Sequence, residues 1–266
     1  MLSVTNLTLS YSGRVLMQDV SFDLEPGCIM GLVAPNGYGK TTLLKAMANI
    51  KAARVTGSIA VDDLPANQVA RRRARVFYAP GEGTLLYPGM TVGEHLAMTR
   101  KLWRSQRSFD DVARACKVDG FLNKRVRACS QGMRQQLTLA IAYMTGARYL
   151  LLDEPMNALD PTNVQLNSAI MRSLAQRGTG IIMSSHILDN VDQLSDKILF
   201  VKDKGLVLFD PSAPAASVSP AAPSPSVPAA PTPTAASPTV SRAGAHFASG
   251  SVHASRAIDI YNELYL

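Results

Sequence analysis

The chain has 266 residues, of which 47% are hydrophobic and 18% charged, and its formal net charge is +7. This length supports one sizeable core and argues against an assembly of several large domains. The three cysteines include no Cys-x-x-Cys pair, so a disulfide framework or a zinc site is not expected and a reducing compartment is favoured.

Two kinds of targeting segment are also not expected. No apolar run reaches the roughly 18–20 residues that a membrane span requires, and the run 137–152 is interrupted by Gly146 and Arg148. The first residues show no basic region followed by an apolar stretch, so we expect no signal peptide.

The positive charge is concentrated in two stretches, 71–75 and 100–107, which contain eight arginines and lysines. Such density is typical either of a nucleic-acid surface or of a solvated basic face, for example one near anionic lipid headgroups. No aromatic-plus-basic nucleic-acid motif accompanies it, so we expect a basic face and no nucleic-acid partner.

Apolar strands alternate with helices along residues 1–210. The pattern predicts strands at 3–11, 20–24, 28–33, 58–61, 76–78, 149–152, 180–184, 197–201 and 206–209. It predicts a helix from Lys40, a helical block from about 92 to 146 and a further helix after residue 155. Uniformly apolar strands that alternate with helices indicate an α/β fold, with a mostly parallel sheet covered on both faces.

A glycine-rich loop follows the strand 28–33. It departs by one residue, Ala34, from the phosphate-loop pattern G-x-x-x-x-G-K-[ST]. Its glycines let backbone N–H groups approach phosphates, Lys40 supplies a positive charge, and Thr41 supplies a hydroxyl to Mg²⁺. We therefore expect a P-loop NTPase core whose nucleotide-binding residues are Ala34, Pro35, Asn36, Gly37, Tyr38, Gly39, Lys40, Thr41 and Thr42.

Two acids end the apolar strand 149–152. In P-loop enzymes the first acid, here Asp153, would hold Mg²⁺ together with Thr41, and the second, Glu154, would polarise the attacking water. Acids at a strand end are common, but their place downstream of a phosphate loop favours a catalytic role for this pair.

The segment Cys129-Ser130-Gln131-Gly132-Met133 resembles the signature motif of ATP-binding cassette (ABC) transporter subunits. The resemblance covers residues 1–210. It implies ATP and Mg²⁺ as ligands, an N-terminal antiparallel β-subdomain and an inserted α-helical subdomain at about 83–146. It also implies that Ser130 and Gly132 face the nucleotide of a partner cassette. Ser130 is equally a plain helix N-cap.

Three further residues match the family by position. The resemblance implies that Tyr11 stacks on adenine, although it is also an ordinary strand tyrosine. It implies that Asp160 belongs to the D-loop, although Asp-Pro is also a plain helix start. It implies that His186 is a switch histidine, which joins Glu154 and Lys40 as the expected catalytic residues.

One family element is missing. The family usually carries Gln after the strand 76–78, where this chain has Gly81, and Glu82 is a candidate substitute. The apolar residues that follow, Leu85 to Met90, lie where the resemblance implies contact with a membrane subunit.

The composition changes after residue 210. Residues 211–241 contain nine Pro, nine Ala and seven Ser but no charge, so we expect a disordered Pro/Ala/Ser-rich linker over 211–250. Ile258, Tyr261 and Tyr265, with Leu264 beside them, predict a short helical segment at 251–266. A helix this short is marginal alone, so we expect it to dock on the cassette.

The resemblance implies an ATPase subunit that dimerises, with a second copy or a homologous cassette, around two ATP and drives a separate membrane permease. The signature variant and the missing Gln resemble exporters, and the expected location is peripheral, on the cytoplasmic face of the cell membrane. Two alternatives stay open: a soluble, non-transport ABC ATPase, and a weakly hydrolysing regulatory nucleotide-binding subunit suggested by Ala34 and Gly81.

Overall fold

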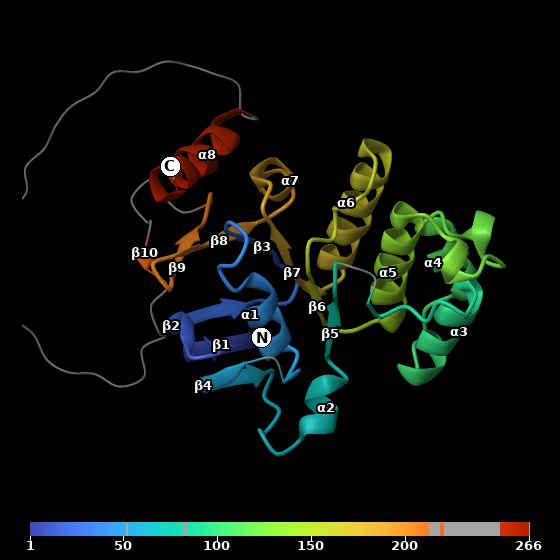
Figure 1. The fold of residues 1–266 in the computed structure, drawn as a ribbon, viewed down its shortest axis with the longest axis horizontal. Coiled ribbons are helices and arrows are strands. Elements are labelled where there is room, and N and C mark those ends of the chain that lie inside the picture. The colour runs from blue at the N-terminus through green and yellow to red at the C-terminus, as the bar shows by residue number, and fades with distance from the viewer. Residues whose placement is uncertain (52, 82–83, 213–218, 221–250, 266) are drawn as a thin grey trace, which may run out of the picture.

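A computed structural model describes residues 1–51, 53–81, 84–212, 219–220 and 251–265. Two sheets organise these residues (Figure 1). One has three strands in the order β2-β1-β4, and the other has seven in the order β10-β9-β8-β3-β7-β6-β5. The strands are β1 (Leu2–Tyr11), β2 (Arg14–Leu24), β3 (Ile29–Val33), β4 (Arg54–Val61), β5 (Val76–Ala79), β6 (Tyr149–Leu152), β7 (Gly180–Ser185), β8 (Lys197–Lys202), β9 (Gly205–Phe209) and β10 (Ser219–Pro220).

Pairing within the two sheets confirms the expected fold class. Strands β3, β5, β6, β7 and β8 are mutually parallel, while β9 and β10 extend that sheet in antiparallel fashion. Strand β1 pairs antiparallel with both β2 and β4, which makes the N-terminal β-subdomain.

Helices cover the large sheet and extend beyond it (Figure 1). Helices α3 and α4 pack against α5 and gather at one end of the molecule, while α8 lies at the other end, beside α7. The helices are α1 (Lys40–Met47), α2 (Val69–Arg73), α3 (Val92–Leu102), α4 (Phe109–Ala115), α5 (Gln131–Thr145), α6 (Pro161–Gln176), α7 (Leu188–Asp192) and α8 (Ser251–Tyr265). None of the helices in the described ranges is both long and apolar enough to cross a bilayer.

The strand period of two distributes the apolar side chains over both faces of the large sheet. In β3, Ile29 and Val33 join the core cluster that includes residues of α5 and α6, whereas Met30 and Leu32 join the one that includes α1 and the β-subdomain. Successive side chains of a strand point to opposite faces, so a strand covered on both sides must be apolar throughout. This explains why β3 and β6 read as uninterrupted apolar runs.

Some elements differ from the sequence prediction. Strand β2 begins at Arg14 instead of residue 20, because Ser12 and Gly13 both have positive φ and form a tight hairpin turn directly after β1. The short helices α2 and α7 were not predicted.

Arg72 and Arg75 of the first basic stretch have specific partners, the Ile59 carbonyl and the Asp62 carboxylate, so this stretch is only partly a solvated face.

The terminal helix docks on the cassette, through a face that differs by one residue from the predicted one. Ala257 is fully buried, and Tyr261, Leu264 and Tyr265 pack against the core, whereas Ile258 is 38% exposed. Positions 257, 261 and 264 repeat at helical spacing, so a small alanine takes the place that the sequence pattern gave to isoleucine. The predicted linker, 211–250, lies almost entirely outside the described residues.

Asp62 joins the two sheets at the end of β4. Its carboxylate accepts a hydrogen bond of 2.6 Å from the Tyr149 hydroxyl and pairs with Arg75 at 2.7 Å and Arg148 at 3.2 Å. Burial by itself raises the pKa of Asp62, but the hydrogen bonds from Tyr149 and the amino terminus, with the charges of the amino terminus and Arg148, outweigh it and leave the pKa below its ordinary value.

Replacement of this carboxylate, Asp62→Asn, should lower the free energy of unfolding at pH 7 by about 1 kcal/mol, because two arginines lose their partner. A lowered folded-state pKa stabilises the fold above the unfolded-state pKa, so the difference should shrink as pH falls below about 4. Urea unfolding at several pH values measures this. Asp63→Asn, at an exposed neighbour, is the matched control; equal losses for both variants would refute the role of Asp62.

Candidate functional site

The phosphate loop connects β3 to α1 and is shaped by its glycines. Gly37 and Gly39 have φ of 86° and 94°, a backbone conformation that L side chains rarely adopt, and Gly39 is also the N-cap of α1. The loop lines a cavity of about 570 Å³ with residues 36–42. The amino end of α1 therefore opens onto this cavity, where the positive end of the helix dipole favours an anion.

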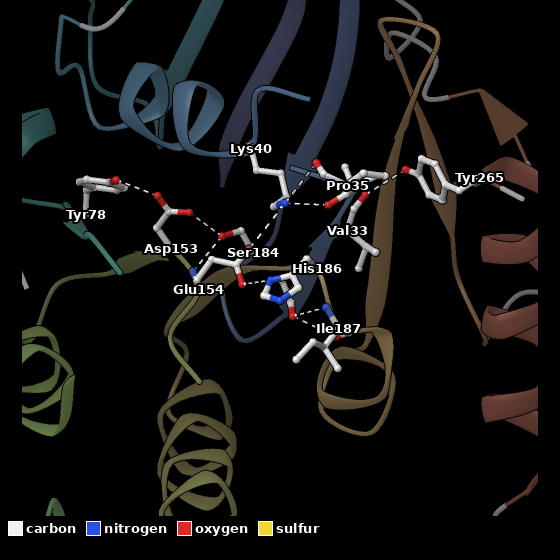
Figure 2. A network of polar contacts seen from close by, with 12 residues as sticks. Val33, Pro35, Lys40, Tyr78, Asp153, Glu154, Ser184, His186, Ile187 and Tyr265 are labelled. Atoms are coloured by element: carbon white, nitrogen blue, oxygen red, sulfur yellow. Dashed lines mark hydrogen bonds and ion pairs between the residues drawn. The ribbon is translucent and has the colours of Figure 1, made fainter. Parts of the chain in front are cut away.

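Lys40 points into the same region and is nearly fully buried. Its Nζ atom donates to the Ala34 carbonyl at 2.6 Å and lies 3.5 Å from a carboxylate oxygen of Glu154 (Figure 2). Ala34 thus contributes through its backbone, which explains why the loop tolerates alanine where the strict pattern has glycine.

Asp153 is held at both carboxylate oxygens. The Tyr78 hydroxyl donates to Oδ2 at 3.0 Å, and the Ser184 hydroxyl donates to Oδ1 at 2.6 Å. Ser184 also accepts a hydrogen bond of 2.9 Å from the backbone N–H of Glu154, so one hydroxyl connects both acids to β7 (Figure 2). These contacts leave the buried carboxylate with little freedom to turn.

Glu154 and His186 form the outer part of the site. His186 Nδ1 lies 3.0 Å from Glu154 Oε2, and Glu154 stands in the left-handed backbone region with φ of 49°. Such a backbone costs on the order of 1–3 kcal/mol and persists where the surroundings enforce it, often at functional sites. The side chain of Glu154 is thereby held between Lys40 and His186.

The cavity brings together most of the residues predicted for the phosphates and for catalysis. Its lining contains residues 36–42, both acids and His186, and also Tyr78, Pro80, Gly81, Thr84 and Asn157. Thr41 and Asp153 supply hydroxyl and carboxylate oxygens, the ligands that Mg²⁺ prefers, so the residues present fit this ion. Glu82, the candidate substitute for the missing Gln, lies outside the described residues.

Six predicted residues lie away from this lining. Ala34 and Pro35, at the start of the phosphate loop, are not among the lining residues, although the Ala34 carbonyl accepts from Lys40. Tyr11 is exposed at the end of β1. Ser130 caps α5 by accepting a hydrogen bond from the Met133 N–H, and Asp160 caps α6 by accepting one from the Asn163 N–H. Gly132 is the second residue of α5. The capping roles considered for Ser130 and Asp160 are therefore present in the single chain.

Sequence reasoning missed Tyr78 and Ser184. Both lie at carboxyl ends of strands that flank the strand of the two acids: β5 and β7 each pair in parallel with β6. A signal for Ser184 was present, because a serine ends an otherwise apolar run. The hydroxyl of Tyr78 gave no such signal, because tyrosine also fits an ordinary buried strand.

Position 81 is sterically restricted. A Cβ atom on Gly81 would lie 2.5 Å from the carbonyl oxygen of Asp153, far inside van der Waals contact. In the conformation described here, only glycine fits at this position. The glycine that replaces the family's Gln is therefore packed directly against the backbone of the two acids.

Comparisons with known proteins agree with this geometry. The family model described as "ABC transporter" matches residues 17–157. The lantibiotic transport ATP-binding protein SrtF of Streptococcus pyogenes is 30% identical over 209 residues, which cover 78% of this chain and 90% of that protein. The Nod factor export ATP-binding protein I of Rhizobium johnstonii is 29% identical over 202 residues, which cover 74% and 65%.

Solved structures show the same fold. An ATP-binding subunit of an ABC transporter superposes with a TM-score of 0.68 at 24% identity, covering 75% of this chain and 85% of the other. A dimeric ATP-binding cassette in a post-hydrolysis state with ADP and phosphate gives a TM-score of 0.67 at 19% identity, covering 77% and 95%. With the phosphate loop, both acids and the histidine around one cavity, the chain belongs to the ABC transporter family as an ATP-binding ATPase subunit.

Proposed function

We propose that two copies of this chain, or one copy and a homologous cassette, close around two ATP molecules and drive a separate membrane permease. The observation that carries the proposal is the grouping of Lys40, Asp153, Glu154 and His186 around the phosphate-loop cavity. Such an arrangement can bind a triphosphate, hold a water and stabilise the charge that develops on the γ-phosphate.

In this proposal the phosphate loop and Lys40 bind the β- and γ-phosphates. Mg²⁺, held by Thr41 and Asp153, would neutralise phosphate charge. Glu154 accepts a proton from the attacking water, because its carboxylate is fixed beside Lys40 and His186 at the cavity. His186, at the mouth of the cavity, orients Glu154 and donates to the γ-phosphate.

Residues outside the cavity act across the dimer. Ser130 and Gly132 begin α5, a helix of 15 residues whose amino end is free to approach an anion of the partner cassette. Asp160 lies at the start of α6, near the same surface, and Tyr11 provides an exposed ring for adenine. These four residues need a second cassette or a bound nucleotide to complete their roles.

We propose export as the direction of transport and the cytoplasmic face of the membrane as the location. The relatives named for lantibiotic transport and Nod factor export support this direction. For the domain organisation we propose a cassette over 1–210 with a helical subdomain at about 83–146, a linker over 211–250 and the terminal helical segment at 251–266.

The reaction mechanism predicts that Glu154→Gln still binds ATP and accumulates as an ATP-bound dimer, since hydrolysis is what reopens it. Size-exclusion chromatography with light scattering, in the presence of ATP, measures the dimer. In the double variant Lys40→Ala/Glu154→Gln the dimer should disappear together with ATP binding. A Glu154→Gln protein that stays monomeric at high concentration, while binding ATP, would contradict the proposed closure.

The restriction at position 81 predicts that Gly81→Ala lowers kcat at least tenfold, because the added methyl group must displace the backbone that carries Asp153 and Glu154. Gly120→Ala is the matched control, since a Cβ there meets nothing within 4 Å. ATPase assays and thermal unfolding of the two variants test this. Unchanged kcat in a folded Gly81→Ala protein would show that the acids tolerate the added methyl group and would refute the restriction at position 81.

The permease contact is predicted to involve the surface at Leu85 to Met90. Tyr87 is 60% exposed, and its ring stacks on His95 at the start of α3. Tyr87→Asp should keep ATP binding and weaken association with the permease in a detergent-extracted complex. Leu102→Asp, which places the same charge on an exposed residue at the end of α3, should leave association unchanged. Equal loss of association in both variants would contradict a permease contact at Leu85 to Met90.

A further inference from the structure

The last residue of the terminal helix touches the phosphate loop. The Tyr265 hydroxyl lies 3.2 Å from the carbonyl oxygen of Val33 (Figure 2). It also lies 2.6 Å from the carbonyl oxygen of Val201 in β8. Val33 is the last residue of β3, so its carbonyl stands where the strand gives way to the loop. A residue 232 positions further along the chain therefore contacts the strand end from which the loop begins.

The strand ends explain why a hydroxyl fits there. Strand β3 pairs in parallel with β8 as far as Val33 opposite Phe200. Pro35 has no backbone N–H, so this ladder cannot continue into the loop. The Tyr265 hydroxyl spans the two strand ends instead. Its single proton is shared between the two carbonyls, with the shorter bond to Val201.

The ring of Tyr265 adds a contact within the loop itself. It meets Tyr38 edge to face, with ring centroids 6.1 Å apart and an interplanar angle of 85°. Aromatic pairs favour this geometry. Tyr38 lines the nucleotide cavity and is 43% exposed, and it stands between two glycines that give the loop its freedom. Burial raises the pKa of Tyr265 above its ordinary value, so its hydroxyl remains a donor across the physiological pH range.

The rest of α8 fixes this tyrosine in place. Ala257 is fully buried, Tyr261 packs on Tyr265 with ring centroids 4.9 Å apart, and the helix contacts α7 and β8. Near the end of the helix, Lys202 of β8 donates to the Glu263 carbonyl at 3.5 Å. A positive charge is favourable at this end of a helix.

We propose that Tyr265 is a positioning residue for the phosphate loop, supplied by the chain's own terminal helix, and that α8 docking and nucleotide binding strengthen each other. This rests on the proposed function, in which the loop binds the phosphates of ATP. A loop already restrained at Val33 and Tyr38 loses less conformational freedom when a nucleotide binds. Coupling of binding free energies is reciprocal, so a bound nucleotide must also favour the docked helix.

Removal of the Tyr265 hydroxyl tests whether this residue positions the phosphate loop. Tyr265→Phe keeps the ring against Tyr38 but loses both carbonyl contacts, and should raise the Kd for a fluorescent ATP analogue three- to tenfold. Tyr261→Phe is the matched control, because it removes a hydroxyl from the same helix, one turn earlier, without a contact to the loop. If α8 were only a structural cap, Tyr265→Phe would lower the Tm and leave the Kd unchanged, and the proposal would be wrong.

The coupling between α8 docking and nucleotide binding can be tested in the wild-type protein. Backbone amides of α8 should exchange with deuterium at least twofold more slowly when ADP is bound than in its absence. The Lys40→Ala protein, which should not bind ADP, is the control and should show no slowing. Exchange that is identical with and without ADP in the wild type overturns the coupling, even if Tyr265→Phe proves too unstable to assay.

The two proposals fail in distinguishable ways. Nucleotide binding by Lys40→Ala as tight as that of the wild type would refute the phosphate-loop site and with it the proposed function. Loss of binding in Lys40→Ala, with wild-type affinity in Tyr265→Phe, would refute only the role of the terminal helix.

Discussion

The carboxylate of Asp153 is the point through which three parallel strands are held in one arrangement. It lies just beyond β6, and hydroxyl groups from β5 and β7 reach it from both sides. The carboxyl ends of parallel strands lie at the same edge of a sheet, so Tyr78, Asp153 and Ser184 meet although they are far apart in the chain. Because the two hydroxyls fix both oxygens of Asp153, the sheet determines where this carboxylate can bind a cation beside the phosphates.

The backbone of the second acid depends on the same contacts. Glu154 adopts a left-handed conformation that is unfavourable for a residue with a side chain, and its N–H is satisfied by Ser184. On the opposite side, Gly81 approaches the Asp153 carbonyl so closely that a side chain has no room. The backbone at Gly81 therefore leaves no room for a side chain beside the two acids.

Much of the site could be predicted because its elements are local in sequence. The phosphate loop, the two acids and the histidine are short patterns attached to strand ends, and each pattern carries its own chemistry. Tyr78 and Tyr265 could not be found this way, because their roles come from contacts between strands or between a helix and a loop. The start of β2 was missed for a similar reason: two positive φ angles at Ser12 and Gly13 extend a hairpin that the apolar pattern begins only at Val20.

The stability of the terminal helix also depends on contacts with residues that are distant in the sequence. A helix of 15 residues is marginal alone in water, so α8 depends on its contacts with α7, β8 and the loop. Its attachment to the cassette makes docking intramolecular, so weak contacts suffice whatever the protein concentration. When the docked helix is only slightly more stable than the undocked one, a small change in one of those contacts shifts the balance between the two states. Since Tyr38 lies on the nucleotide cavity and Tyr265 lies on Tyr38, the contact most exposed to such a change is the one at the phosphate loop.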